Sequence, residues 1–186
     1  MGELRWQVVD DGLGQLALFD EVERHVGRGE YRGMEFLHVR ARTIINTLPA
    51  GSRMPFRHTI NAYRGCSHAC VYCFARPTHE YLNLDPGPDF ERKIVVKINA
   101  VEKLRAELGP GRWSGEPIAM GTNTDPYQRG EGRYHLTRGM IGVLAEFANP
   151  FSILTKSTLI LRDLDVLTEA AARTEVSTML SIVPCR

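Results

Sequence analysis

Three cysteines fall within eight residues of this 186-residue chain. Cys66, Cys70 and Cys73 follow the spacing C-x3-C-x2-C. Soft thiolates of this kind select iron–sulfur clusters, zinc or cuprous copper. Three thiolates on one loop can hold three irons of a cubic cluster and leave the fourth iron open to a small molecule. The cysteine loop, residues 66–73, is therefore the first candidate for a chemically active site.

Zinc is the main alternative ligand for these thiolates. Structural zinc sites have four ligands, which usually come as two pairs. Here one C-x2-C pair stands beside Cys66, and the fourth ligand would be His68, His79 or Cys185. Ferredoxin-type clusters take four cysteines each, and the loop supplies only three. These residues favour a [4Fe–4S] cluster with one open iron, and a zinc site with three thiolates and one histidine stays open as the alternative.

The sequence around the cysteines is more specific than their spacing. The run from Tyr63 to Leu82, with the aromatic Tyr72 just before the third cysteine, resembles the signature of radical S-adenosylmethionine (SAM) enzymes. It is most similar to an uncharacterised bacterial radical-SAM family related to spore photoproduct lyase. Later strings match in the same order, and the resemblance covers residues 53–182: Gly121-Thr-Asn-Thr-Asp-Pro-Tyr-Gln, Leu154-Thr-Lys-Ser and Leu161-Arg-Asp-Leu-Asp.

The resemblance implies an enzymatic activity with two cofactors. A [4Fe–4S] cluster would be held by the three cysteines, and SAM would bind its open iron. Reductive cleavage of SAM would give methionine and a 5′-deoxyadenosyl radical, which abstracts hydrogen from an unknown substrate. A reducing electron donor of the flavodoxin or ferredoxin type is also implied. The SAM-contacting positions that the resemblance implies are Tyr72, Thr124, Lys156 and Ser181.

The chain departs from spore photoproduct lyases in two ways. Those enzymes carry a cysteine on the strand that here ends at Gly121-Thr122, and this chain has none there. The hydrogen-donor role and the DNA-repair activity are therefore not carried over. The sequence also stops at Ser181-Ile-Val-Pro-Cys-Arg, within or just past a strand expected to be buried. We expect a radical-SAM core truncated at its C-terminus; the alternatives are a non-catalytic zinc–thiolate module and an inactive fragment.

The elements that would position these residues alternate between strand and helix. Residues 1–56 are predicted to be a lead-in segment that packs on the core, with a short helix at Ala41–Thr47. Residues 57–186 are predicted to form the core. Helices are expected after caps at Asn99 and Thr137 and over Arg162–Arg173. Strands are expected at Thr59–Tyr63, Lys93–Ile98, Pro117–Gly121, Phe151–Thr155 and Glu175–Val183.

This alternation predicts an α/β fold with parallel βαβ units, and the resemblance narrows it to a partial (β/α) barrel of the radical-SAM type. In such folds the chemistry gathers at the C-terminal ends of the strands. The cysteine loop, Thr122–Asp125 and Thr155–Ser157 each follow a predicted strand. We therefore expect these three segments to meet at one edge.

The composition is that of an ordinary globular protein, with 43% hydrophobic residues, 24% charged residues and a net charge of +1. No basic stripe points to nucleic acid, although nucleic acid is not excluded as a partner. No run of about 18 apolar residues predicts a membrane span. The first residues lack the apolar stretch of a signal peptide. We therefore expect a cytoplasmic protein whose clustered thiols stay reduced and act as metal ligands.

Overall fold

The computed structural model describes residues 22–109, 111 and 113–182. Within them the chain divides into two compact units, and each unit has its own mixed sheet. The described part of the first unit is residues 22–42 and 63–99, and the second unit holds 43–62 and the described residues from 100 onward. The expected α/β class is thus observed, and neither sheet closes on itself. The division differs from the predicted boundary at residue 57.

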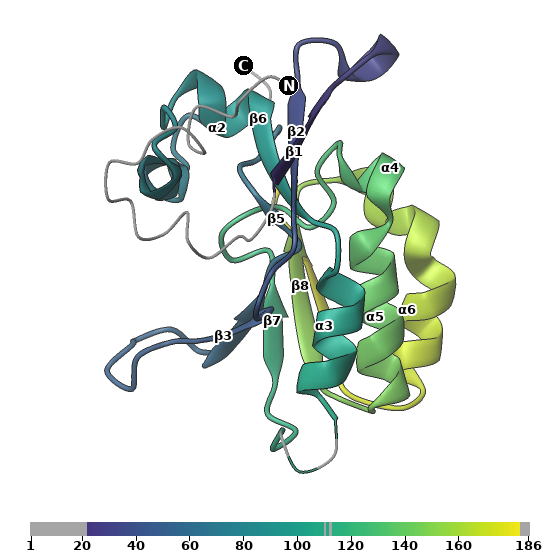
Figure 1. Cartoon of the computed structure of the whole chain (residues 1–186). Helices are drawn as coiled ribbons and strands as arrows, with labels where there is room; N and C mark the ends of the chain where they lie inside the picture. The colour runs from purple at the N-terminus through teal and green to yellow at the C-terminus, as the bar shows by residue number, and fades with distance from the viewer. Residues whose placement is uncertain (1–21, 110, 112, 183–186) are drawn as a thin grey trace. The chain divides into compact units, whose positions relative to one another are not determined.

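The sheet of the first unit has the strand order β1-β2-β6-β5 (Figure 1). The first two strands form an antiparallel hairpin, β2 runs parallel to β6, and β5 runs antiparallel to β6. The central β6 is β-branched and its three middle residues are fully buried. The strands are β1 (Val22–Val26), β2 (Glu35–Val39), β5 (Tyr63–Arg64) and β6 (Lys93–Lys97).

Short helices complete the first unit. They are η2 (Gly29–Tyr31), in the β1–β2 connection, η3 (Arg76–Leu82) and α2 (Pro88–Arg92). Leu82 and Leu84 pack on Leu37 of β2 and Val95 of β6, and this contact forms one small apolar core. The segment after the cysteine loop is therefore held against the sheet by burial of aliphatic side chains.

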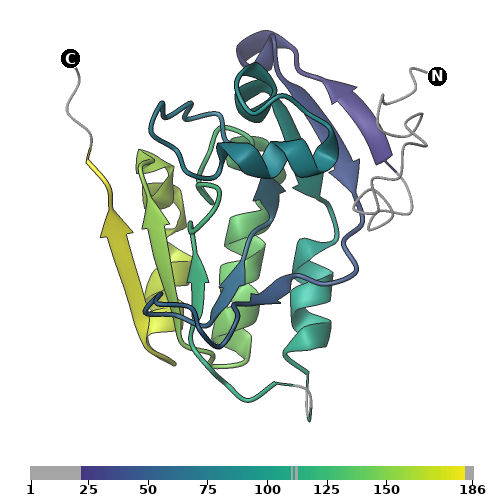
Figure 2. The ribbon, with the colours of Figure 1, turned by 90° about the vertical axis from the view of Figure 1, so that its left-hand side faces the viewer.

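The sheet of the second unit has the order β3-β4-β7-β8-β9. Strands β4, β7, β8 and β9 run parallel to one another, and β3 is an antiparallel edge strand. Figure 2 shows β8 and β9 side by side and pointing the same way. The strands are β3 (Ile45–Thr47), β4 (His58–Ile60), β7 (Ile118–Met120), β8 (Phe151–Thr155) and β9 (Val176–Leu180).

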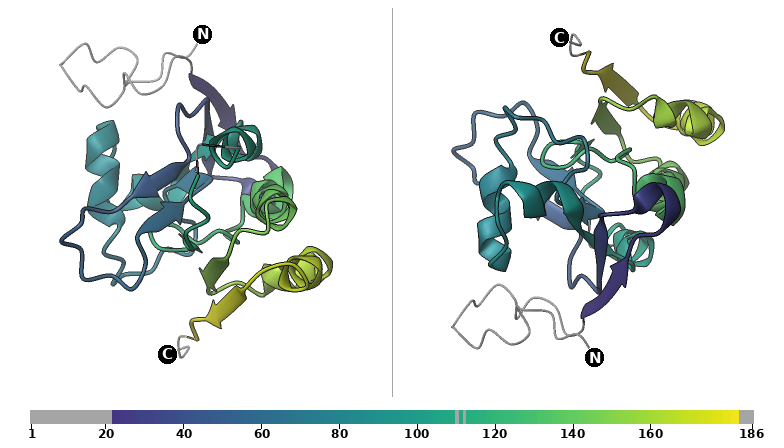
Figure 3. Two further views of the ribbon diagram at one scale, coloured as in Figure 1. Left: turned by 90° about the horizontal axis from the view of Figure 1, so that it is seen from below. Right: turned by 90° about the horizontal axis from the view of Figure 1, so that it is seen from above.

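Helices connect these parallel strands. Figure 3 shows α3, α5 and α6 in a row along one side of the strands, with α5 in the middle. The apolar residues Met140, Ile141 and Leu144 of α5 are buried. None of the helices in the described residues is long and apolar enough to cross a membrane. The helices are α3 (Ala100–Glu107), α4 (Glu131–Tyr134), α5 (Leu136–Glu146), η4 (Thr158–Asp163) and α6 (Leu164–Ala171).

Three local predictions were wrong. No helix forms at Ala41–Thr47: strand β3 covers Ile45–Thr47, and the backbone N–H groups of Ile44 and Ile45 donate to the Glu107 carboxylate at 2.8 Å each. The strand expected at Thr59–Tyr63 is split between β4 and β5, which belong to different sheets. The third concerns the start of α5.

Thr137 does not cap α5, because the helix already begins at Leu136. The carboxylate of Glu131 takes that role instead. It accepts hydrogen bonds from the backbone N–H groups of Thr137 at 3.0 Å and Arg138 at 3.3 Å. A carboxylate is favourable at this end of a helix because the helix dipole is positive there.

Candidate functional site

The chain enters the cysteine loop through a position that only glycine fits. Gly65 has a φ of +84°, and a Cβ there would lie 2.8 Å from Cε1 of His79 and 2.9 Å from the carbonyl oxygen of Phe90. The next residue, Cys66, donates its backbone N–H to that same carbonyl at 2.8 Å. Gly65 thus brings the first thiol close against the α2 segment.

The backbone of the loop fixes its own shape. The N–H of Ala69 donates to the carbonyl of Cys66 at 3.3 Å, and the N–H of Cys73 donates to the carbonyl of Cys70 at 3.2 Å. Ala69 has a positive φ of 54°, which tightens the first of these turns. These bonds use main-chain groups, so the shape of the loop does not depend on bonds to the thiols.

Arg76 fastens the loop to the rest of the first unit. Its Nε donates to the Cys70 carbonyl at 3.0 Å. Its Nη1 reaches the carbonyls of Pro86 at 3.2 Å and Gly87 at 3.3 Å, and its Nη2 pairs with Glu91. These contacts make Arg76 a scaffold residue of the loop.

The three thiols are not in disulfide bonds, and they differ in exposure. Cys66 is buried, whereas Cys70 and Cys73 are half-buried. Cys66 packs with Ala75 and Phe90, and Cys73 lies against this group. Cys66 is therefore the least accessible of the three cysteines and lies in an apolar cluster.

The spacing of the sulfurs bears on which metal suits them. A tetrahedral zinc ion with Zn–S bonds of about 2.3 Å needs sulfurs about 3.8 Å apart. Among the described residues, these three Sγ atoms do not form a set that lies mutually within 4.8 Å. A cubic cluster binds each thiolate at a separate iron and so accepts a wider spacing.

The other zinc-ligand candidates are placed differently. His79 is fully buried, and its Nε2 lies 3.0 Å from the carbonyl oxygen of Lys93. Because a carbonyl can only accept, Nε2 carries the proton in this bond. Burial also lowers the pKa of His79. His68 is half-buried within the loop, and Cys185 lies outside the described residues.

The loop also carries exposed apolar side chains. Val71, Tyr72 and Phe74 are exposed by 90%, 62% and 79%. Such a concentration of apolar surface on one short loop is typical of a binding surface. Tyr72, predicted to contact SAM, therefore presents its ring at the surface of the first unit.

A second polar cluster lies at the strand ends of the second unit, and Asp125 is its centre. The Asp125 carboxylate follows β7 and accepts from Oγ1 of Thr155 at 2.6 Å and from the N–H of Lys156 at 2.7 Å. It also accepts from the N–H of Tyr127 at 2.9 Å. One carboxylate thus ties the exit of β7 to the exit of β8.

Strand β9 is joined to this cluster through Lys156 and Ser181. Nζ of Lys156 donates to Oγ of Ser181 at 2.9 Å, and the N–H of Ser181 donates to the carbonyl of Thr155 at 2.9 Å. Thr124, the residue before Asp125, is buried. The predicted positions Thr124, Lys156 and Ser181 therefore all lie at the C-terminal ends of neighbouring parallel strands, β7, β8 and β9.

The predicted common edge is thus observed for the segments of the second unit. The cysteine loop belongs to the first unit, and for it the common edge stays a prediction. The sequence placed Asp125 at this edge but did not predict that its carboxylate joins two strand ends. The signal was the Asp125-Pro126 pair directly after a strand, because such a carboxylate often accepts from nearby backbone N–H groups.

Gly121 makes this strand-end arrangement possible. It has a φ of +87°, and a Cβ there would lie 1.9 Å from the carbonyl oxygen of Leu154. The chain leaving β7 therefore crosses β8 at a distance that leaves no room for a side chain. This close crossing is what places Asp125 within reach of Thr155 and Lys156.

Behind the strand ends lies a buried ionic network. Arg162 donates to Asp163 through Nε and Nη2, at 2.7 Å each, and to Oε1 of Glu131 at 3.0 Å. Both carboxylates are fully buried. Burial alone would raise the pKa of Asp163, but hydrogen bonds from Arg162 and Arg138 lower it. Burial together with the Asp163 charge raises the pKa of Tyr127.

No family model matches the chain, and no solved structure does either. The uncharacterised protein Rv2578c of Mycobacterium tuberculosis is 52% identical over 178 residues, which cover 94% of this chain and 51% of the relative. The uncharacterised protein MJ0683 of Methanocaldococcus jannaschii is 31% identical over 134 residues, 72% of this chain and 47% of the relative. The chain therefore spans about half the length of the curated relatives it matches.

Proposed function

We propose that this chain is the cluster-binding part of a radical-SAM enzyme. The observation that carries the proposal is the preshaped loop with three thiols outside any disulfide, Cys66, Cys70 and Cys73. Its shape is set by Gly65, by main-chain bonds and by Arg76, so the sulfurs are positioned by the fold. A site organised by its supporting residues loses less entropy when it binds a ligand.

The residues present have separable tasks in this proposal. The three cysteines hold the cluster, which with SAM supplies reductive cleavage of the sulfonium carbon–sulfur bond. Lys156 offers a cation for the SAM carboxylate. Asp125 and Ser181 orient that lysine through its backbone N–H and its Nζ. The exposed ring of Tyr72 offers an apolar face for the adenine.

The fold of the second unit supports the proposal at a coarser level. Four parallel strands with helices along one side are what the first strands of a (β/α) barrel would form. We propose that the remaining strands belong to the other half of the longer relatives, together with the substrate site. The electron donor, of flavodoxin or ferredoxin type, and a reducing cytoplasmic setting are part of the same proposal.

Anaerobic reconstitution of the 186-residue chain tests the cluster first. We expect a brown protein with about four irons and four sulfides per chain. Single Cys66→Ala, Cys70→Ala and Cys73→Ala variants should each lower the iron content. Cys185→Ala is the matched control, because this cysteine lies outside the triplet, and it should load as the wild type does.

Incubation of the loaded chain with dithionite and SAM then tests the chemistry. Release of 5′-deoxyadenosine that depends on all three cysteines is the expected result. One tightly bound zinc with no acid-labile sulfide would overturn the proposal in favour of the zinc module. A loaded cluster without 5′-deoxyadenosine would retain the cluster site but contradict SAM cleavage by this chain.

A further inference from the structure

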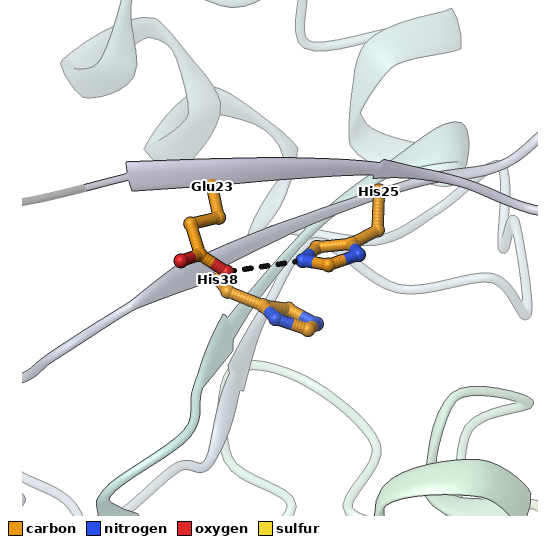
Figure 4. Close-up of side chains that lie close together, drawn as sticks. All are labelled: Glu23, His25 and His38. Atoms are coloured by element: carbon orange, nitrogen blue, oxygen red, sulfur yellow. Dashed lines mark hydrogen bonds and ion pairs between the residues drawn. The ribbon is translucent and has the colours of Figure 1, made fainter.

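A second group of metal-binding side chains lies far along the sequence from the cysteine loop. Glu23 and His25 are on β1 and His38 is on β2 (Figure 4). One ligand atom from each of the three lies within 4.8 Å of the other two. This is the one such set of three found among the described residues.

The hairpin register brings these residues together. Glu23 is the direct cross-strand partner of His38, and His25 is two residues further along β1. Side chains alternate between the faces of a strand, so all three project from the same face. Directly opposite residues have Cβ atoms about 5 Å apart. Five consecutive residue pairs hold β1 to β2, which fixes this placement.

The distances come close to those of a metal site. Oε2 of Glu23 lies 3.3 Å from Nε2 of His25, and the rings of His25 and His38 stack with centroids 3.9 Å apart (Figure 4). A tetrahedral zinc ion with bonds of about 2.0–2.1 Å needs ligand atoms about 3.4 Å apart. The Glu23–His25 pair already has this separation. Glu23 is exposed and the two imidazoles are half-buried, and one ligand atom of His38 lies within 4.8 Å of this pair.

The opposite face of the hairpin carries a different kind of pair. Arg24, between Glu23 and His25, points to the other face and pairs there with Glu35, with Nε 2.9 Å from Oε2. Glu23 instead faces two imidazoles, which are zinc ligands in their neutral form.

We propose that Glu23, His25 and His38 bind a zinc ion on the β1–β2 hairpin. Two imidazoles and one carboxylate match the ligand set of open zinc sites, in which water takes the fourth position. Bound zinc would tie edge strand β1 to β2, which itself pairs with β6. The site lies wholly within the first unit and does not depend on the iron–sulfur proposal.

Zinc titration of the full chain in competition with a chromophoric chelator tests the site. The wild type should bind one more zinc than His38→Ala and Glu23→Gln, or bind that zinc at least about tenfold more tightly, since even supporting residues around a metal contribute that much. Arg24→Ala is the matched control from the other face and should keep the zinc. Glu23→Gln is nearly isosteric and exposed, so it stays informative if His38→Ala unfolds.

Cobalt separates this site from the thiols, which also bind zinc. The cobalt spectrum of the wild type minus that of His38→Ala should show a site without thiolate-to-cobalt charge transfer, because its ligands are nitrogen and oxygen. A thiolate band in that difference would overturn the assignment. Equal zinc stoichiometry and affinity in the wild type, His38→Ala and Glu23→Gln would also overturn it.

Discussion

Two residues, Gly65 and His79, position the first cysteine, Cys66. Gly65 lies where a side chain would strike the ring of His79 and the carbonyl of Phe90. His79 in turn donates from Nε2 to the carbonyl of Lys93 at the start of β6. The position of Cys66 therefore rests on a buried imidazole and on a missing Cβ.

Gly65→Ala should destabilise the first unit and lower iron loading. Strain at positive φ costs about 1 kcal/mol, and the forced contact adds about 1–3 kcal/mol. Gly33→Ala is the matched control, because Gly33 has the same φ of +84° but nothing within 4 Å of its ideal Cβ. Urea unfolding and iron analysis of both variants measure the difference. Equal effects would show that the contact with His79 and Phe90 does not matter.

His79 should make stability fall in mild acid. Burial lowers its pKa below the ordinary value of 6.5, so the folded protein keeps the ring neutral while the unfolded chain binds a proton. The contribution is therefore fully present above pH 6.5 and is lost as the pH falls below it, by up to about 1.4 kcal/mol per pH unit until the folded pKa is reached.

Denaturant unfolding at several pH values, for the wild type and His79→Gln, checks this dependence. The variant keeps the other five of the chain's six histidines, so the difference between the two slopes isolates His79. The wild type should have the steeper slope below pH 6.5. Parallel curves for the two proteins would contradict a buried neutral His79.

At the scale of elements, the exits of β7 and β8 are organised by charges that the helices bury. Glu131 caps α5, and Arg162 joins Glu131 to Asp163 at the end of η4. The two carboxylates are completely buried, so the guanidinium is their main compensation. Removal of one partner from such a network leaves uncompensated charge in the interior.

Arg162→Ala should therefore destabilise the second unit by about 3 kcal/mol or more. Arg105→Ala is the control, because the Arg105–Glu146 pair is half-exposed and solvent screens it. Chemical unfolding of both variants gives the comparison, and the control should differ little from the wild type. A loss of stability in Arg105→Ala as large as in Arg162→Ala would contradict the role assigned to burial.

Elements with strong local patterns could be predicted from the sequence. Strand Phe151–Thr155 has the predicted bounds, and β6 differs from its prediction by one residue at the end. Both are apolar runs between turn residues, so their burial was encoded locally. The alternation of helices and strands also predicted the parallel strand pairs of the second unit.

The missed elements depend on distant residues. Strand β3 pairs with β4, and its start is held by hydrogen bonds from Ile44 and Ile45 to Glu107, more than sixty residues away, a contact that nothing local signals. Residues 22–39 were included in a lead-in, yet β2 pairs with β6 across more than fifty residues. The cluster of Glu23, His25 and His38 was missed for a different reason, because it exists only through the register of the β1–β2 hairpin and neither strand was predicted.

For the whole molecule, the division into two units places the proposed cluster ligands and the proposed SAM contacts of the strand ends in different units. The thiols belong to the first unit and the strand-end cluster of Asp125, Lys156 and Ser181 belongs to the second. The chain passes between the units at residues 42–43, 62–63 and 99–100. Because each unit has its own sheet, loss of a polar contact in one should leave the local structure of the other intact.

Lys156→Ala should therefore separate cluster loading from SAM binding. Iron content should stay at about four per chain, because the cysteine loop is untouched. SAM affinity should fall by about 10- to 100-fold, which corresponds to a lost charge-assisted hydrogen bond of about 1.5–3 kcal/mol. Iron analysis and equilibrium SAM binding on the loaded protein measure both quantities. Lys103→Ala, on α3 of the same unit, is the control, and wild-type SAM affinity in Lys156→Ala would remove this lysine from the proposed site.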